Sequence, residues 1–182
     1  IMKERLMLIA GGVDKKGVVY ALTSILKKFN FNIEDSSMLM LRKTFSMIML
    51  LSSDKKYDKS RFSGEISSFM DKFGMTVDIR TISEKEMNES ADKGRVYSIS
   101  ISGADKPGIV NGITEVIFKN NGNIVDLETK SSERVKPHAY YMFMEVCVSN
   151  DKAGKKLESA LKLKAKKLGV HVTMEKVEEA VL

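Results

Sequence analysis

The stretch Gly103-Ala104-Asp105-Lys106-Pro107-Gly108-Ile109-Val110 decides the fold, because a near copy of it stands earlier in the chain. That copy is Gly12-Val13-Asp14-Lys15-Lys16-Gly17-Val18-Val19, and the offset from Asp14 to Asp105 is 91 residues. The same offset relates Asn32-Ile33 to Asn123-Ile124. Because the chain has 182 residues, the repeat is half its length, and two copies of one small domain account for the sequence.

The second copy is slightly longer than the first. The offset grows to 95 between Gly74 and Gly169, so the second copy has gained four residues. We expect them in Ser131–His138, opposite the short turn Arg42–Thr44 of the first copy.

Each copy has the hydrophobic pattern of strand, helix, strand, strand, helix and strand. In the first copy, apolar residues at helical spacing predict two amphipathic helices, separated by a hairpin signal at 32–41 and 45–52. Gly74 suits the end of the second helix, where a left-handed residue is common. The helical stripes are Val18, Leu22, Ile25, Leu26 and Phe29, then Phe62, Ile66, Phe69, Met70 and Phe73; the first strand is expected at Leu6–Ala10 and the last around Val77, Ile79 and Ile82.

This order predicts an α+β fold with two tandem ferredoxin-like βαββαβ units. Each unit is expected to be a four-stranded antiparallel sheet with two helices on one face and the first and third strands at the centre. The expected domains are residues 1–82 and 95–182. The polar, charged stretch Ser83–Gly94 between them is expected to be a linker.

Three other functions of this fold leave no trace in the sequence. The third strand of the first copy, Phe45–Leu51, lacks the Gly-aromatic motif of RNA-recognition domains. The first loop, Val13–Gly17, has neither the Cys-x-x-Cys of metal carriers nor the phosphate-holding Arg of acylphosphatases. What both copies share is Asp-Lys-(Lys/Pro)-Gly-(Val/Ile)-Val between a strand and a helix, followed by Asn-Ile at the start of a strand.

This pattern resembles the ACT domain, a small-molecule regulatory module of amino-acid metabolism, and the resemblance covers both copies. The first copy departs from the family pattern at Lys16, where Pro is usual. Two such units without a catalytic domain look most like the glycine cleavage system transcriptional repressor family. They are also similar to the N-terminal segment of formyltetrahydrofolate deformylases. The resemblance implies a non-enzymatic regulator that binds a small amino acid between units.

The physical chemistry of the motif suits a zwitterion. Glycine at a helix start lets a ligand approach free backbone amides, which can bind a carboxylate. Asp14 and Asp105 either cap the helix or accept an ammonium, Asn offers a donor and an acceptor, and Pro107 suits a first helical turn. Asp-x-x-Gly is also common as pure capping. The candidate ligand-binding residues are Asp105, Pro107, Gly108, Ile109, Val110, Asn123 and Ile124, with Asp14, Gly17, Val18, Val19, Asn32 and Ile33 in the first copy.

Catalysis, metal binding and cofactor binding are not expected. Cys147 is the single cysteine, in an apolar run that favours a buried thiol, and His138 and His171 are the only histidines. No Ser-His-Asp, Cys-His or paired-carboxylate arrangement is apparent. One cysteine, no signal segment and no transmembrane run fit a cytoplasmic protein without membrane contact.

The net charge of +6 is divided evenly, with +3 in residues 1–90 and +3 in 91–182, which is weak evidence for nucleic acid. We therefore expect a small amino acid ligand and a protein partner, and no direct DNA binding. A homodimer is left as one option. Seven lysines on one helix are expected to form a solvated face or a partner surface: Lys152, Lys155, Lys156, Lys162, Lys164, Lys166 and Lys167. The alternatives are a pairing scaffold without ligand and a fragment related to the deformylases.

Overall fold

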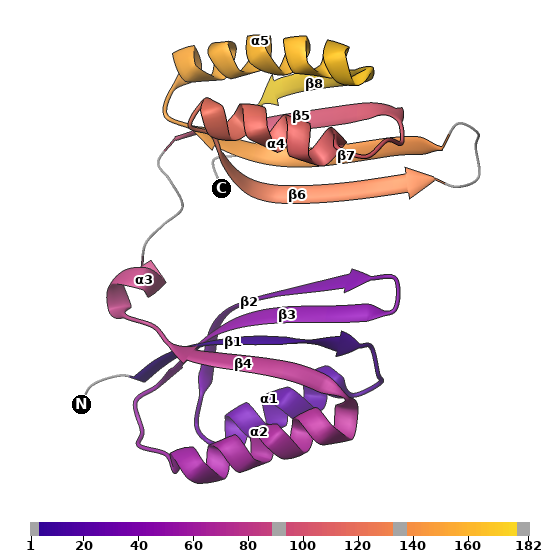
Figure 1. Ribbon diagram of the computed structural model, residues 1–182. Coiled ribbons are helices and arrows are strands. Elements are labelled where there is room, and N and C mark those ends of the chain that lie inside the picture. The colour runs from indigo at the N-terminus through magenta and orange to yellow at the C-terminus, as the bar shows by residue number, and fades with distance from the viewer. Residues whose placement is uncertain (1–3, 89–93, 133–137, 178–182) are drawn as a thin grey trace. The chain divides into compact units, whose positions relative to one another are not determined.

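The computed structural model describes residues 4–88, 94–132 and 138–177 and divides the chain into two compact units, residues 1–89 and 90–182 (Figure 1). Each unit is a βαββαβ fold, as the repeat predicts. Residues 89–93 of the expected linker and 133–137 of the expected insertion lie outside the described residues, as do 178–182 of the expected second domain and 1–3 of the first.

Unit 1 is a four-stranded antiparallel sheet in the order β2-β3-β1-β4, so the first and third strands are central. Its helices lie together on one face of the sheet (Figure 1). The elements are β1 (Glu4–Val13), α1 (Val18–Lys28), β2 (Asn32–Leu41), β3 (Thr44–Ser53), α2 (Lys59–Phe73) and β4 (Met75–Thr81).

Unit 2 repeats this topology, with the sheet order β6-β7-β5-β8. The predicted fold class is therefore confirmed for both copies. The elements are β5 (Arg95–Ala104), α4 (Ile109–Lys119), β6 (Asn123–Ser132), β7 (Ala139–Val148), α5 (Asp151–Leu168) and β8 (Val170–Lys176).

The helical stripes predicted in the first copy pack into the core of unit 1, and the equivalent apolar residues form the core of unit 2. Val18, Leu22 and Leu26 of α1 are buried in unit 1, and Ile109, Ile113 and Ile117 of α4 are buried in unit 2. Each stripe packs against alternate residues of the central strands, because successive side chains of a strand point to opposite faces. Burial of these apolar side chains is the main stabilising contribution in each unit.

The beginning of the expected linker is folded rather than irregular. A short helix, α3 (Glu84–Asn88), follows β4, and Ser83 and Glu86 form a reciprocal capping box at its start. Arg5 contacts Glu84 and Arg80 contacts Glu86, each at 3.0 Å, which ties this helix to unit 1. The Ser-x-x-Glu spacing was visible in the sequence, but the lack of apolar periodicity there pointed to a loop.

The two outer hairpin strands are exposed along nearly their whole length. Every residue of β2 is exposed, and β6 is exposed except at Ile124 and Ser132. The exposed stretch of β2 includes four consecutive large apolar residues, Met38–Leu41, which are 44–65% exposed. An apolar, unpaired strand edge is a surface suited to pairing with another strand.

Candidate functional site

The first candidate feature is the loop from the first strand into the first helix of each unit. In unit 2 the amide of Asp105 donates to the carbonyl of His138 (2.8 Å), which holds the loop to β7. Gly108 then adopts a left-handed conformation (φ 92°) immediately before α4. Gly17 does the same before α1 (φ 85°). Most side chains strain this conformation, so both helix starts favour glycine.

The starts of both helices are unobstructed. A Cβ atom placed on Gly17 or Gly108 would meet nothing within 4 Å. In α4 the Gly112 amide donates to the Gly108 carbonyl (2.8 Å). Among the described residues of unit 2, this is the first amide of the helix that has a carbonyl partner. In unit 1 the amide of Val18 already donates to Lys15 (3.2 Å). The partial positive charge of the helix start is therefore accessible to an anion, more completely in unit 2.

The expectation that Asp14 and Asp105 cap these helices is wrong. Glycine occupies the capping position, and neither helix has a side-chain hydrogen bond there. Each aspartate lies three residues before the cap, too early in the loop to fold back on the first helical amides. Pro107 likewise lies in the turn before α4 and not in its first turn. Both carboxylates are exposed.

A hollow of about 270 Å³ lies at the helix start of unit 1. It brings together four of the predicted residues, Asp14, Gly17, Val18 and Val19, with side chains that the sequence did not suggest. The full lining is Asp14, Lys15, Lys16, Gly17, Val18, Val19, Tyr20, Met38, Met40 and Phe45.

Met38 and Met40 are the functional candidates that sequence reasoning missed. They pair with Met47 and Phe45 across the β2–β3 ladder, so they lie on the helix side of the sheet. They are nevertheless 53% and 44% exposed, because β2 is the outermost strand. In the sequence, the only hint of this placement was their spacing of two residues, which puts both side chains on the same face of a strand just before the tight turn. Methionine is well suited to such adaptable apolar walls.

The predicted asparagines lie far from these helix starts within the same unit. Asn32 pairs with Ser52, which pairs with Arg5, whereas the loop follows Val13, eight residues further along β1. At about 3.3 Å per residue, the two ends are roughly 26 Å apart. Ile33 lies beside Asn32, and the register of unit 2 separates Asn123 and Ile124 from Gly108 in the same way. One unit alone therefore cannot place both sets of groups on one small ligand.

The open face of the unit 2 sheet carries a second hollow, of about 450 Å³. Lys130, Tyr141, Ser102 and His171 form one row across all four strands, and the next row contains Phe143 and Ser100. His171 lies on this face, opposite to its apolar neighbours in β8, as alternation predicts. The lining is Ser100, Ile101, Ser102, Glu128, Lys130, Tyr141, Met142, Phe143, His171 and Thr173.

The next feature is the set of chemically reactive side chains in the described part of the chain. No group of three or more His, Cys, Asp or Glu side chains there could hold a metal ion, and Cys147 is buried. Lys119 and Lys164 lower the pKa of Glu115 to about 2, mainly by hydrogen bonds to its exposed carboxylate. That shift belongs to a surface ion-pair cluster on α4 and α5, away from the loops. No described helix is long and apolar enough to span a membrane.

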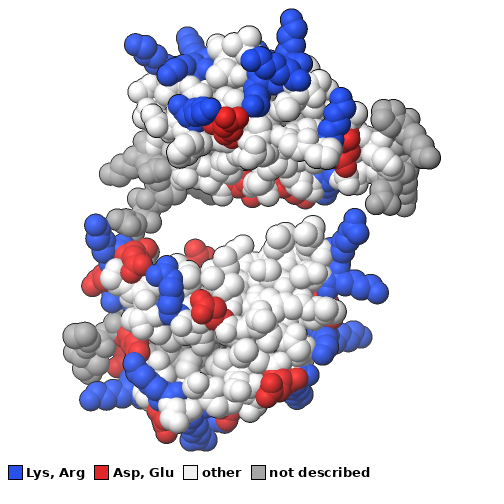
Figure 2. All heavy atoms as spheres, viewed as in Figure 1, with Lys and Arg blue, Asp and Glu red and all other residues white. Residues whose placement is uncertain are grey.

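The lysines of α5 form a basic surface (Figure 2). Lys162 pairs with Glu158 (2.6 Å) and Lys164 with Glu115 (2.9 Å). The remaining lysines of this helix have no ion-pair partner among the described residues. This arrangement fits both a solvated face and a surface for an acidic partner, as the sequence left open.

Known proteins match this arrangement in sequence and in fold. The ACT domain family profile matches residues 4–80 and again 98–175. A UPF0237 protein of Methanocaldococcus jannaschii is 35% identical over 78 residues, which covers 42% of this chain and 82% of that protein. A UPF0237 protein of Pyrobaculum aerophilum is 39% identical over 77 residues, covering 42% of this chain and 81% of that protein.

Two solved structures match nearly the whole chain. One is a protein from Galdieria sulphuraria, with a TM-score of 0.80 and 26% identity, covering 97% of this chain and 100% of that one. The other is described as a putative glycine cleavage system transcriptional repressor, with a TM-score of 0.70, covering 98% of this chain and 100% of that one. At 14% identity, the second likeness is one of fold.

Proposed function

This chain belongs to the ACT domain family and carries the domain twice; from that premise we propose that it is a non-enzymatic regulator that binds a small amino acid where ACT units meet. The observation that carries the proposal is the pair of unobstructed helix starts. Each presents unoccupied space in front of a left-handed glycine, with an exposed aspartate three residues earlier. The amides suit a carboxylate and the aspartate suits an ammonium, which together recognise a zwitterion.

A site between units also explains the distant asparagines. If two exposed hairpin edges pair antiparallel, the start of one strand lies beside the end of the other. In unit 1 the end of β2, at Leu41, lies near the helix start, because the β2–β3 turn contacts the first loop through Asp14. In such a pair, Asn32 at the start of one β2 strand would therefore lie near the helix start of the other unit. The proposed site therefore combines Asp14, Gly17, Val18 and Val19, or their unit 2 equivalents, with an Asn-Ile pair from another unit.

The regulatory output is proposed to pass to a protein partner. A ligand shifts an equilibrium only by binding one arrangement more tightly than another, and a ligand held between units meets that condition. The partner would act in the cytoplasm, in transcriptional control of amino-acid or one-carbon metabolism. The proposal includes no direct DNA binding, because positive charge is spread over both halves of the chain.

The test is a thermal-shift screen of the twenty amino acids, followed by calorimetric titration of any that stabilise the chain. Gly108→Asn and Gly17→Asn place a side chain in the helix starts while tolerating a positive φ, unlike valine, which that conformation strains. Whichever helix start binds the amino acid, we expect the asparagine variant at that helix start to bind it at least tenfold more weakly. Gly64→Asn, on the exposed surface of α2 with nothing near its Cβ, is the matched control.

Two outcomes would contradict the proposal. Tight binding that survives both loop variants would place the ligand elsewhere. Absence of stabilisation by every amino acid would favour a pairing scaffold, for which the exposed apolar edge Met38–Leu41 is the specific support.

A further inference from the structure

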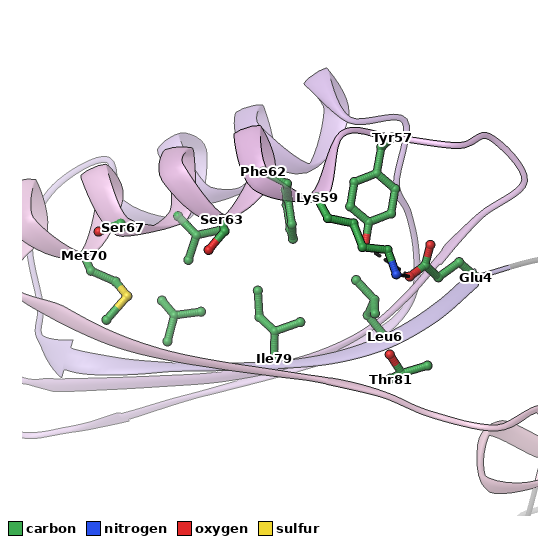
Figure 3. Close-up of a pocket in the computed structure, with 12 residues that line it drawn as sticks. Glu4, Leu6, Tyr57, Lys59, Phe62, Ser63, Ser67, Met70, Ile79 and Thr81 are labelled. Carbon is green, nitrogen blue, oxygen red and sulfur yellow. Dashed lines mark hydrogen bonds and ion pairs between the residues drawn. The ribbon is translucent and has the colours of Figure 1, made fainter.

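Unit 1 contains a groove of about 400 Å³ between α2 and β4, on the opposite edge of the sheet from β2. Figure 3 shows apolar side chains of Phe62, Met70 and Ile79 directed into it, with Leu6 below. The hydroxyls of Ser63 and Ser67 lie along its α2 side. At one end stand Glu4, Tyr57 and Lys59, and the full lining is Glu4, Leu6, Tyr57, Lys59, Phe62, Ser63, Ile66, Ser67, Met70, Val77, Ile79 and Thr81.

In unit 2 a side chain of the chain itself occupies the corresponding place. The strand registers make Tyr97 the equivalent of Leu6, because Tyr97 pairs with Val146 and Lys176 as Leu6 pairs with Leu51 and Thr81. The Tyr97 ring lies against α5 so closely that a Cβ on Gly154 would be 2.5 Å from it. Its hydroxyl donates to the Asp151 carboxylate (2.9 Å). Unit 2 thus fills this position with an apolar ring whose hydroxyl bonds to a carboxylate.

The polar end of the unit 1 groove offers a similar acceptor. Lys59 Nζ lies 2.8 Å from Glu4 Oε1, and the Tyr57 hydroxyl donates to that same oxygen (3.3 Å). The other carboxylate oxygen, Oε2, receives no hydrogen bond from the described residues. Leu6 is shorter than Tyr97 and leaves the groove open beside it, and among the described residues Oε2 is the Glu4 oxygen that can still accept a hydrogen bond.

We propose that this groove is a binding site for a phenol-like molecule, an apolar ring or short chain whose single hydroxyl donates to Glu4. The apolar walls would take the body of the ligand, and Glu4 Oε2 would accept its hydroxyl proton in a hydrogen bond. An anionic head is less suited than a hydroxyl, because Lys59 already pairs with Glu4 and Oε2 can accept a hydrogen bond but not donate one. The site is separate from the helix starts, since β4 and β2 are opposite edges of the sheet.

The experiment titrates the full chain with para-cresol and its ethyl, propyl and butyl homologues, followed by calorimetry or ligand-detected NMR. Each added methylene should raise the affinity about fourfold until the groove is full, since each buries further apolar surface. Ser67→Phe projects a ring into the groove from the exposed side of α2, and we expect it to weaken binding at least tenfold. Ser68→Phe makes the same change one residue along, outside the lining, and should bind as the parent chain does.

Glu4→Gln tests recognition of the ligand hydroxyl. We expect this variant to have a smaller ratio between its affinities for alkylphenols and for alkylbenzoates of the same length. The proposal is overturned if affinity does not grow along the series, or if Ser67→Phe binds as tightly as Ser68→Phe. A change in sedimentation caused by Ser67→Phe alone would also overturn it, because the groove would then be a contact between copies of the chain. None of these outcomes bears on amino acids at the helix starts, so the two proposals fail separately.

Discussion

Units 1 and 2 have the same topology and register, yet they differ at three corresponding places. The outer strand β2 carries Met38–Leu41 where β6 carries Thr129–Ser132. Lys16 stands in the first loop where unit 2 has Pro107, and Leu6 leaves open a groove that Tyr97 fills. Core positions keep their apolar character in both units. Similar core packing therefore specifies the same fold in both units, while the edges, loops and grooves differ.

Gly154→Val should have the largest effect, because it breaks the packing of Tyr97 in unit 2. The Cβ alone would stand 2.5 Å from the ring, and overpacking of this kind costs about 2 kcal/mol of unfolding free energy. Denaturant unfolding measures the loss. Lys59→Val, at the equivalent place in unit 1, should change stability by less than about 0.5 kcal/mol beyond its exposed ion pair.

Adding Tyr97→Leu to Gly154→Val should recover much of that loss, since it gives unit 2 the open groove of unit 1. If the double variant is as unstable as the sum of the two single changes, the clash with Tyr97 is not the cause.

Leu39→Lys should have the next largest effect, on self-association. It gives β2 the residue that β6 has at the equivalent position, Lys130, and a charge on an edge strand opposes pairing. If copies of the chain pair through β2, we expect the self-association measured by analytical ultracentrifugation to weaken about tenfold, roughly 1.4 kcal/mol. Phe118→Lys removes an apolar side chain that is 79% exposed on α4, away from either edge, and is the control. Equal weakening by both variants would show that general surface hydrophobicity drives association.

The smallest effect concerns Tyr57, which precedes α2, and Tyr97 of β5, which contacts the start of α5. Burial, followed by the charge of Glu4, raises the pKa of Tyr57 to about 12, and burial, followed by the hydrogen bond to Asp151, raises that of Tyr97. A raised pKa in the folded state stabilises the fold fully below the ordinary value of about 10. That contribution is lost as pH rises through about 12 for Tyr57.

The measurement is an alkaline titration of the tyrosine rings by NMR, with Tyr57→Phe to assign the late transition. Glu4→Gln should lower the pKa of Tyr57 only in part, because burial is the larger cause. A return of Tyr57 to its ordinary pKa in Glu4→Gln would show that the carboxylate, rather than burial, dominates.

Most of the fold could be predicted from sequence because its signals are local and occur twice. Helical stripes such as Val18, Leu22 and Leu26 specify both the helix and its buried face, and the order of elements then leaves few topologies. The strands extend beyond their apolar runs, since β1 begins at Glu4 and ends at Val13 whereas the pattern covers Leu6–Ala10. The ends of β1 are set by its hydrogen-bonded pairing with β3 and β4. That pairing depends on all three strands, so the sequence of β1 alone does not predict it.

The sequence by itself determined the duplication, the two cores and the glycines before α1 and α4, because these depend on periodicity and on residue types with particular backbone preferences. Only the tertiary structure decided which candidate residues meet. It separated Asn32 from Gly17 by the length of a strand, joined Met38 and Met40 to the helix start, and left the groove beside Leu6 open. Sheet register and the packing of a helix on an edge strand bring residues together across the sequence, and no local pattern records those distances.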